Sequence, residues 1–148
     1  METRESRLVQ SQAAANLQGA RFATTDKLKL FSVPVANAPG LKLADFTVAT
    51  FTGYADVTLT APWLTGLDGN ARAFMKYDGV GAFSCTTAGT PETIYGWYIV
   101  DTGATAVLAY GFFDAPVVVE NAGDKIVVDP FLYFDLLSDA EQEFIAGP

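Results

Sequence analysis

Histidine is absent from the 148-residue sequence, and cysteine occurs once, as Cys85. Without histidine the chain lacks the commonest general base at neutral pH and the commonest metal ligand, so Ser-His-Asp, Cys-His and His-metal sites are excluded within one chain. A lone cysteine forms no intrachain disulfide and here has no imidazole to activate it. We therefore expect Cys85 to be a small buried apolar residue, and stability to come from packing or assembly.

Charged residues are also few, at 18% against 50% hydrophobic residues, which is too apolar a composition for a disordered chain. No apolar run approaches the roughly 18 residues of a membrane helix, so we expect no membrane partner. Residues 1–50 hold six basic and four acidic groups, whereas residues 51–148 hold three basic and thirteen acidic groups. This acidic body would repel nucleic acid, so we expect no nucleic-acid partner.

Short strand-like segments, bounded by turn residues, make up most of the chain. Residues 27–31 and 56–60 alternate in polarity, and 94–100 is apolar on both faces, as in a central strand that would bury Trp97. Asp78-Gly79 and Asn121–Asp124 are typical of hairpin turns, whereas 62–70 favours a loop. The remaining predicted strands are residues 72–77, 80–85, 105–113, 116–120, 125–129 and 131–137. The pattern predicts an all-β fold: a single β-sandwich, jelly-roll-like or barrel domain of about eight strands.

The sequence predicts three regions: an N-terminal arm at 1–25, a β domain at 26–138 and an acidic C-terminal tail at 139–148. Residues 8–18 are rich in Ala and Gln and favour a short helix whose apolar face is thin. Such an arm has too little apolar surface to fold alone, so we expect it to order against a neighbour. The predicted partner-binding residues of the arm are Arg4, Arg7, Leu8, Leu17 and Arg21.

One motif has a catalytic interpretation. Residues 99–104, Ile-Val-Asp-Thr-Gly-Ala, resemble the active-site motif of aspartic proteases, in which two such aspartates share a proton. The chain has a single copy, so Asp101 would need a homodimer. Asp-Thr-Gly is also a favourable hairpin turn with Gly103 at positive φ, and we favour the turn.

Two binding interpretations remain as alternatives. Asp68 and Asn70 offer oxygen ligands for calcium, but the spacing lacks the remainder of a twelve-residue loop, and we favour turn residues for the segment. A sugar-stacking surface is the second alternative, and its aromatic residues would be Tyr54, Trp63, Tyr95, Trp97 and Tyr98. The favoured expectation is that the chain has no catalytic residue, no metal site and no cofactor.

Several blocks together carry a resemblance to a known family. They are residues 27–31, 33–37, 43–47, 51–55, 94–101 and 119–124. Over residues 27–130 the chain resembles small β-rich virion structural proteins of tailed bacteriophages. The resemblance implies a capsid decoration or cement protein with no catalytic residues. It would be made in the host cytoplasm and sit on the virion capsid surface, as a homo-oligomer, with a trimer favoured, bound to the major capsid protein.

The alternative function is a tail or spike adhesin that binds host glycan through its aromatic residues. A more remote alternative is a homodimeric aspartic protease that uses Asp101.

Overall fold

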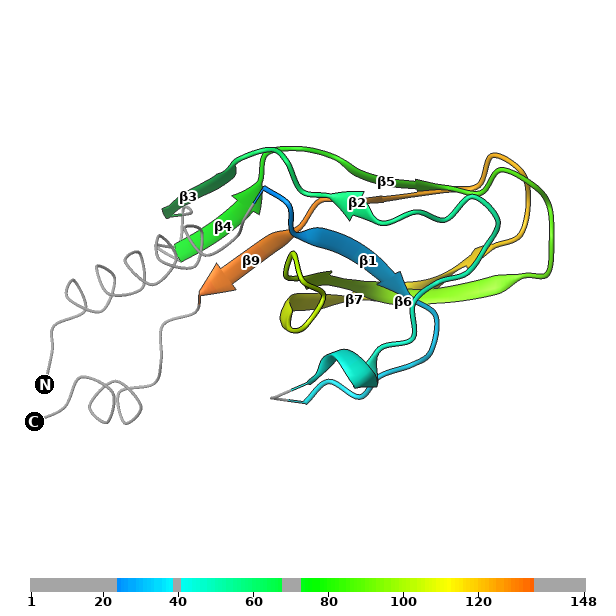
Figure 1. Ribbon diagram of the computed structural model, residues 1–148, viewed down its shortest axis with the longest axis horizontal. Coiled ribbons are helices and arrows are strands. Elements are labelled where there is room, and N and C mark those ends of the chain that lie inside the picture. The colour runs from blue at the N-terminus through cyan, green and yellow to red at the C-terminus, as the bar shows by residue number, and fades with distance from the viewer. Residues whose placement is uncertain (1–23, 39–40, 68–72, 135–148) are drawn as a thin grey trace, which may run out of the picture. The chain divides into compact units, whose positions relative to one another are not determined.

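The computed structural model describes residues 24–38, 41–67 and 73–134, and in these ranges the protein is all-β (Figure 1). The elements are β1 (Lys27–Phe31), the 3-10 turn η1 (Leu43–Asp45), β2 (Val57–Thr58), β3 (Trp63–Leu67), β4 (Ala73–Tyr77), β5 (Gly81–Ser84), β6 (Glu92–Val100), β7 (Val107–Val119), β8 (Lys125–Val128) and β9 (Phe131–Phe134). These strands form three open antiparallel sheets, β2-β1-β6-β7, β3-β4-β9 and β5-β8. The predicted all-β class is confirmed, in the sandwich-like rather than the closed-barrel form.

The chain divides into two compact units. Of the described residues, the large unit holds those of ranges 24–60 and 79–129, and the small unit holds 61–67, 73–78 and 130–134. The large unit therefore holds the four-stranded and the two-stranded sheet, whereas the small unit holds β3, β4 and β9.

The four-stranded sheet of the large unit has β6 at its centre, as the apolar run 94–100 predicted. β1 pairs with β6 on one side, with Leu30 opposite Trp97, and β7 pairs with β6 on the other. β2 pairs with only two residues of β1. Beyond its end, the Leu30 N–H donates to the Tyr54 hydroxyl at 3.2 Å, and this hydroxyl donates to Asp56 at 2.9 Å. Burial of the phenol raises the pKa of Tyr54 above its ordinary value, so it remains a donor at neutral pH.

The two-stranded sheet packs against one face of the four-stranded sheet. A Cβ on Gly81 of β5 would lie 2.4 Å from Cδ2 of Leu28, so the β5 backbone lies directly over β1. Phe83 stacks on Tyr54 with ring centroids 5.6 Å apart, and Ile126 and Val128 of β8 are buried. This arrangement is a small β-sandwich, in which the apolar side of each sheet is removed from water.

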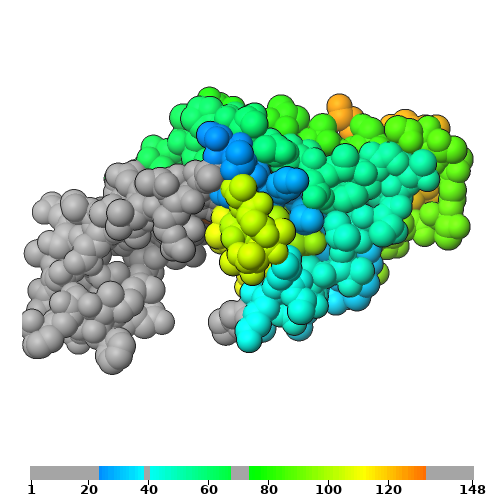
Figure 2. Space-filling view, in the orientation of Figure 1, coloured from blue at the N-terminus to red at the C-terminus, as the bar shows by residue number. Residues whose placement is uncertain are grey.

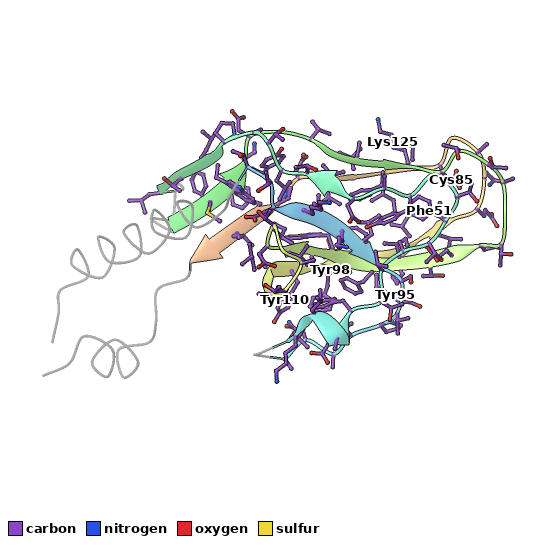
Figure 3. The ribbon with its side chains drawn as sticks, in the orientation of Figure 1. Phe51, Cys85, Tyr95, Tyr98, Tyr110 and Lys125 are labelled. Carbon is purple, nitrogen blue, oxygen red and sulfur yellow. The ribbon has the colours of Figure 1, made fainter. Side chains whose placement is uncertain are left out.

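An aromatic cluster covers the opposite face of the four-stranded sheet. Phe46, which follows η1, stacks on Tyr98 of β6 with centroids 4.6 Å apart and meets Phe31 edge-on at 5.2 Å. Burial and the nearby Asp56 carboxylate raise the pKa of Tyr98 to about 12. The Tyr110 hydroxyl donates to the Ala38 carbonyl at 2.9 Å, which fixes the covering loop to β7. Figure 3 shows Tyr95, Tyr98 and Tyr110 gathered on the side that this loop covers.

Two glycines allow close packing around β6 and β7, one on each face of the sheet. A Cβ on Gly96 would lie 2.1 Å from the Gly111 carbonyl oxygen and 2.7 Å from the Phe31 ring. A Cβ on Gly111 would lie 2.6 Å from the Trp97 indole. Trp97 itself is only partly buried, although its ring lies over Gly111, so the prediction that it would be buried in the central strand was too strong.

The small unit contains a strand that the sequence did not predict. Residues 63–67, within the predicted loop 62–70, form β3 and pair antiparallel with β4 from Trp63 opposite Tyr77 to Leu67 opposite Ala73. Pro62 and Gly66 favoured a loop, but the ladder with β4 and the contact of Trp63 with Tyr77, at 5.4 Å between ring centroids, determine the structure. β9 pairs with the other side of β4.

Both predicted hairpins were wrong in their pairing, although both turns exist. β4 already pairs with β3 and β9, so β5 has no free side of β4 to join and pairs with β8 instead. Asp78-Gly79 therefore connects the two units. In the same way, Asn121–Asp124 connects β7 of one sheet with β8 of another. This turn is held by the Asp124 carboxylate, which accepts from the Glu120 and Asn121 N–H groups at 3.0 and 2.9 Å and has a lowered pKa as a result.

Candidate functional site

The outer edge of β7 is the first candidate surface. β7 is the last strand of the four-stranded sheet and runs for 13 residues, where the sequence predicted two shorter strands. Its register with β6 passes from Phe112 opposite Gly96 to Val117 opposite Ile94. Residues 113–116 of β7 therefore lie against Tyr95 alone and bulge from the ladder. The bulge contains Asp114 and Pro116, and a proline is tolerated there because it has no N–H to pair.

Beyond the bulge, β7 exposes apolar side chains beside the edge of the sheet. Val117 is 38% exposed and Val118 is 52% exposed. We call Val117, Val118 and the exposed bulge residues Asp114 and Pro116 the β7 edge surface. Among the described strands, none pairs with the outer edge of β7. A free strand edge with exposed valines is a surface to which another chain can pair, whereas the bulge limits uncontrolled pairing along the strand.

The charged residues nearest to this surface along the chain are acidic. Between Asp101 and Asp124 the sequence has four acidic residues and neither lysine nor arginine. Asp114 and Glu120, which lie on either side of the two valines in sequence, are exposed. A partner should therefore present an apolar centre with a neutral or basic rim.

Asp101 lies in the turn between β6 and β7. Its carboxylate accepts hydrogen bonds from the N–H groups of Thr105 and Ala106 at 2.6 and 2.9 Å, and from the Thr105 hydroxyl. These bonds lower the pKa of Asp101. The positive φ that we expected at Gly103 occurs at Ala104 instead, at 53°. The favoured interpretation, a turn residue, agrees with this geometry.

We expect the Asp101→Asn variant to keep its fold, because an amide oxygen can still accept from the two backbone N–H groups. The Asp101→Asn variant and the parent should give the same result in a peptide-cleavage assay, both with and without pepstatin. A pepstatin-sensitive cleavage that disappears in the variant would contradict the turn interpretation and favour the protease.

The aromatic residues proposed for sugar stacking do not form one platform. Trp63 belongs to the small unit and the other four to the large unit. Within the large unit, Tyr98 is 2% exposed and packs in the aromatic cluster, whereas Tyr54 packs against Phe83 on the other face of the sheet. Cys85 is buried, as predicted, and its thiol donates to the Thr87 carbonyl at 3.1 Å.

Other predicted positions lie outside the described residues. They include the five partner-binding residues of the arm, Arg4, Arg7, Leu8, Leu17 and Arg21, the possible calcium ligands Asp68 and Asn70, and the acidic tail. Within the described ranges no three His, Cys, Asp or Glu side chains gather so as to hold a metal. In those ranges no helix is long and apolar enough to cross a membrane.

Sequence reasoning missed the β7 edge surface because it paired Val117–Val119 with the strand after the next turn. Pro116 was the available signal, since a proline next to a strand-like valine run is typical of a sheet edge or a bulge.

Comparison of the chain with protein-family models, with curated proteins and with solved structures finds no significant match.

Proposed function

We propose that this protein is a structural component of a tailed-phage virion, a capsid decoration protein that binds and stabilises the major capsid shell. The observation that carries the proposal is the β7 edge surface, where exposed valines lie beside a strand edge that no other described strand pairs with. The sequence resemblance to small virion proteins supplies the identity of the partner.

The sequence blocks that resemble the phage proteins supply residues that pack together in the large unit. A likeness of fold between this chain and those proteins would require such a role for them. Phe31, Phe46 and Tyr98 come from three different blocks and meet in one aromatic cluster. Gly53, from a fourth block, has a φ of 94° in the turn that leads to Tyr54. A β unit with a buried aromatic cluster suits a protein that must hold its shape on a particle surface.

The β7 edge surface is small for a whole interface, because stable interfaces bury about 1,200–2,000 Å² in total. The arm at 1–25 would add area by ordering against a neighbour, and its three arginines would complement the acidic residues that surround β7. We propose that decoration uses both elements, in a homotrimer on the outer face of the shell.

The binding test uses shells assembled from the major capsid protein of the same phage. The full-length protein should co-sediment with these shells at a saturating ratio. Val118→Asp should weaken binding by about tenfold or more, because it places an unpaired charge in an apolar contact. The substitution should not unfold the protein, because the side chain at residue 118 is half exposed.

Val127→Asp provides a matched control. Val127 is 51% exposed on β8, compared with 52% for Val118, so the two variants add the same charge at equal exposure. The control should bind shells like the parent protein. The proposal would be contradicted if the Val118→Asp variant bound shells as strongly as the parent protein, or if the parent protein did not bind shells. A glycan array would test the adhesin alternative separately.

A further inference from the structure

A polar pocket of about 360 Å³ lies at one end of the large unit. Its walls come from the loop around residues 50–52, the loop 85–91, the first residue of β6 and the end of β7. The first two segments lie side by side, since the Thr86 N–H donates to the Thr52 carbonyl at 3.0 Å. Figure 2 shows the region near residue 50 beside the region near residue 85 at the surface, and Figure 3 shows Phe51 and Cys85 near each other.

Hydrogen bonds hold the walls of this pocket in place. The Glu92 carboxylate accepts from the N–H groups of Thr50 and Phe51, at 2.9 and 3.2 Å, and from the Thr50 hydroxyl at 2.7 Å. On the opposite wall, the Gly89 N–H donates to the Glu120 carbonyl at 3.0 Å. A ligand would therefore meet a pocket that is already formed and would lose little free energy in ordering it.

Three threonines in the lining have unused hydrogen-bonding capacity. The hydroxyls of Thr52, Thr87 and Thr90 make no hydrogen bond within the part of the chain that the structure describes. A hydroxyl both donates and accepts, which matches a ligand whose own groups do both. Phe51 also lines the pocket, but its side chain is buried and its ring meets Tyr54 edge-on, so the three hydroxyls are the groups left for a ligand.

The charge of the pocket narrows the class of ligand. Its described lining contains Glu92 and Glu120 but neither lysine nor arginine, so an anionic ligand would be repelled. A calcium ion needs six to eight oxygen ligands, whereas the Glu92 oxygens are already occupied by three donors. A neutral polyhydroxylated ligand fits both the free hydroxyls and the charge.

We propose that this pocket binds a single neutral sugar residue. The hydroxyls of Thr52, Thr87 and Thr90 exchange hydrogen bonds with the hydroxyls of the sugar. The cavity is near the lower end of the roughly 300–1,000 Å³ typical of ligand sites, which favours one ring over an extended oligosaccharide. This site is separate from the aromatic platform considered from the sequence, and it does not depend on the proposed capsid partner.

The test uses the full-length protein and a panel of free neutral monosaccharides: glucose, galactose, mannose, fucose and N-acetylglucosamine. At least one should receive saturation transfer from the protein in ligand-observed NMR and show saturable binding on titration. Two variants probe the site. Thr90→Val removes a hydroxyl, and Gly89→Leu adds a side chain at a position where a Cβ would meet no atom within 4 Å. Each should weaken binding about tenfold or more without loss of folding.

Thr58→Val, at an exposed position of β2 outside the pocket, is the matched control and should bind like the parent. The proposal is overturned if none of the five sugars binds, if binding survives both pocket variants unchanged, or if only sialic acid or calcium, added as separate probes, binds the protein. The pocket variants should bind capsid shells like the parent protein. The result of the sugar-binding test is therefore independent of the capsid proposal.

Discussion

Replacing Gly96 with valine is expected to lower the free energy of unfolding by about 3 kcal/mol or more. The added Cβ would lie 2.1 Å from the Gly111 carbonyl oxygen, and this oxygen belongs to the backbone of the neighbouring strand and cannot rotate away. The Phe31 ring blocks movement in the other direction, at 2.7 Å. Urea denaturation followed by far-UV circular dichroism measures the change.

Gly89→Ala is the control for this substitution, because a Cβ at Gly89 meets nothing within 4 Å. It should change the free energy of unfolding by less than about 0.5 kcal/mol. If Gly96→Val does not fold, Gly96→Ala should still fold and be measurably less stable than the parent. A valine variant as stable as the parent would show that β6 and β7 do not approach as closely as described.

The second large effect is expected for Phe31→Ala, at about 3–5 kcal/mol of lost stability. Phe31 is fully buried, and its ring meets Phe46, Tyr98 and Phe112 with centroid separations of 5.2, 6.3 and 5.8 Å. Truncation leaves a cavity beneath the loop that Tyr110 anchors through Ala38, so little can collapse into it.

Val33→Ala is the control for Phe31→Ala. It tests whether the loss of stability depends on where the apolar side chain lies or only on its apolar character. Val33 is two residues beyond Phe31 and is 45% exposed, so its truncation should cost less than about 1 kcal/mol. Comparable losses for the two variants would contradict the aromatic cluster as the centre of the large unit.

The sequence predicted strands well where local alternation and burial agree. Residues 27–31 form β1 as expected, and the apolar run 94–100 occupies the centre of its sheet. Both signals are local, since side-chain polarity along the strand reports which faces are covered. Residues 63–67 were missed because their strand state depends on β4, and Pro62 and Gly66 outweighed it locally.

The sequence pattern did not predict which strands pair with each other. Asp78-Gly79 and Asn121–Asp124 have the composition of hairpin turns, and turn chemistry is local. Which strands lie beside each other depends on which edges remain free, and β4 and β6 each have both edges occupied. Because the pairing was predicted wrongly, the exposure of Val117 and Val118 was missed as well. The predicted hairpin placed the next strand beside them.

The candidate sites were only partly predictable for related reasons. Asp101 was interpreted correctly as a turn residue, because its role is local. The pocket for which we propose a sugar ligand could not be predicted, since Thr52, Thr87 and Thr90 come from loops that only the folded sheets bring together. The number of aromatic residues suggested a sugar platform, but within the large unit Tyr54 and Tyr98 pack on different faces of the four-stranded sheet.

The most direct test of the proposed function is a cryo-electron microscopy reconstruction of the intact virion, with mass spectrometry of the same purified particles. We predict that the protein is present in stoichiometric amounts and appears as trimeric density on the outer face of the capsid shell, with the end of β7 at a contact. Absence of the protein from purified particles, or density only at the tail, would contradict the proposed capsid role.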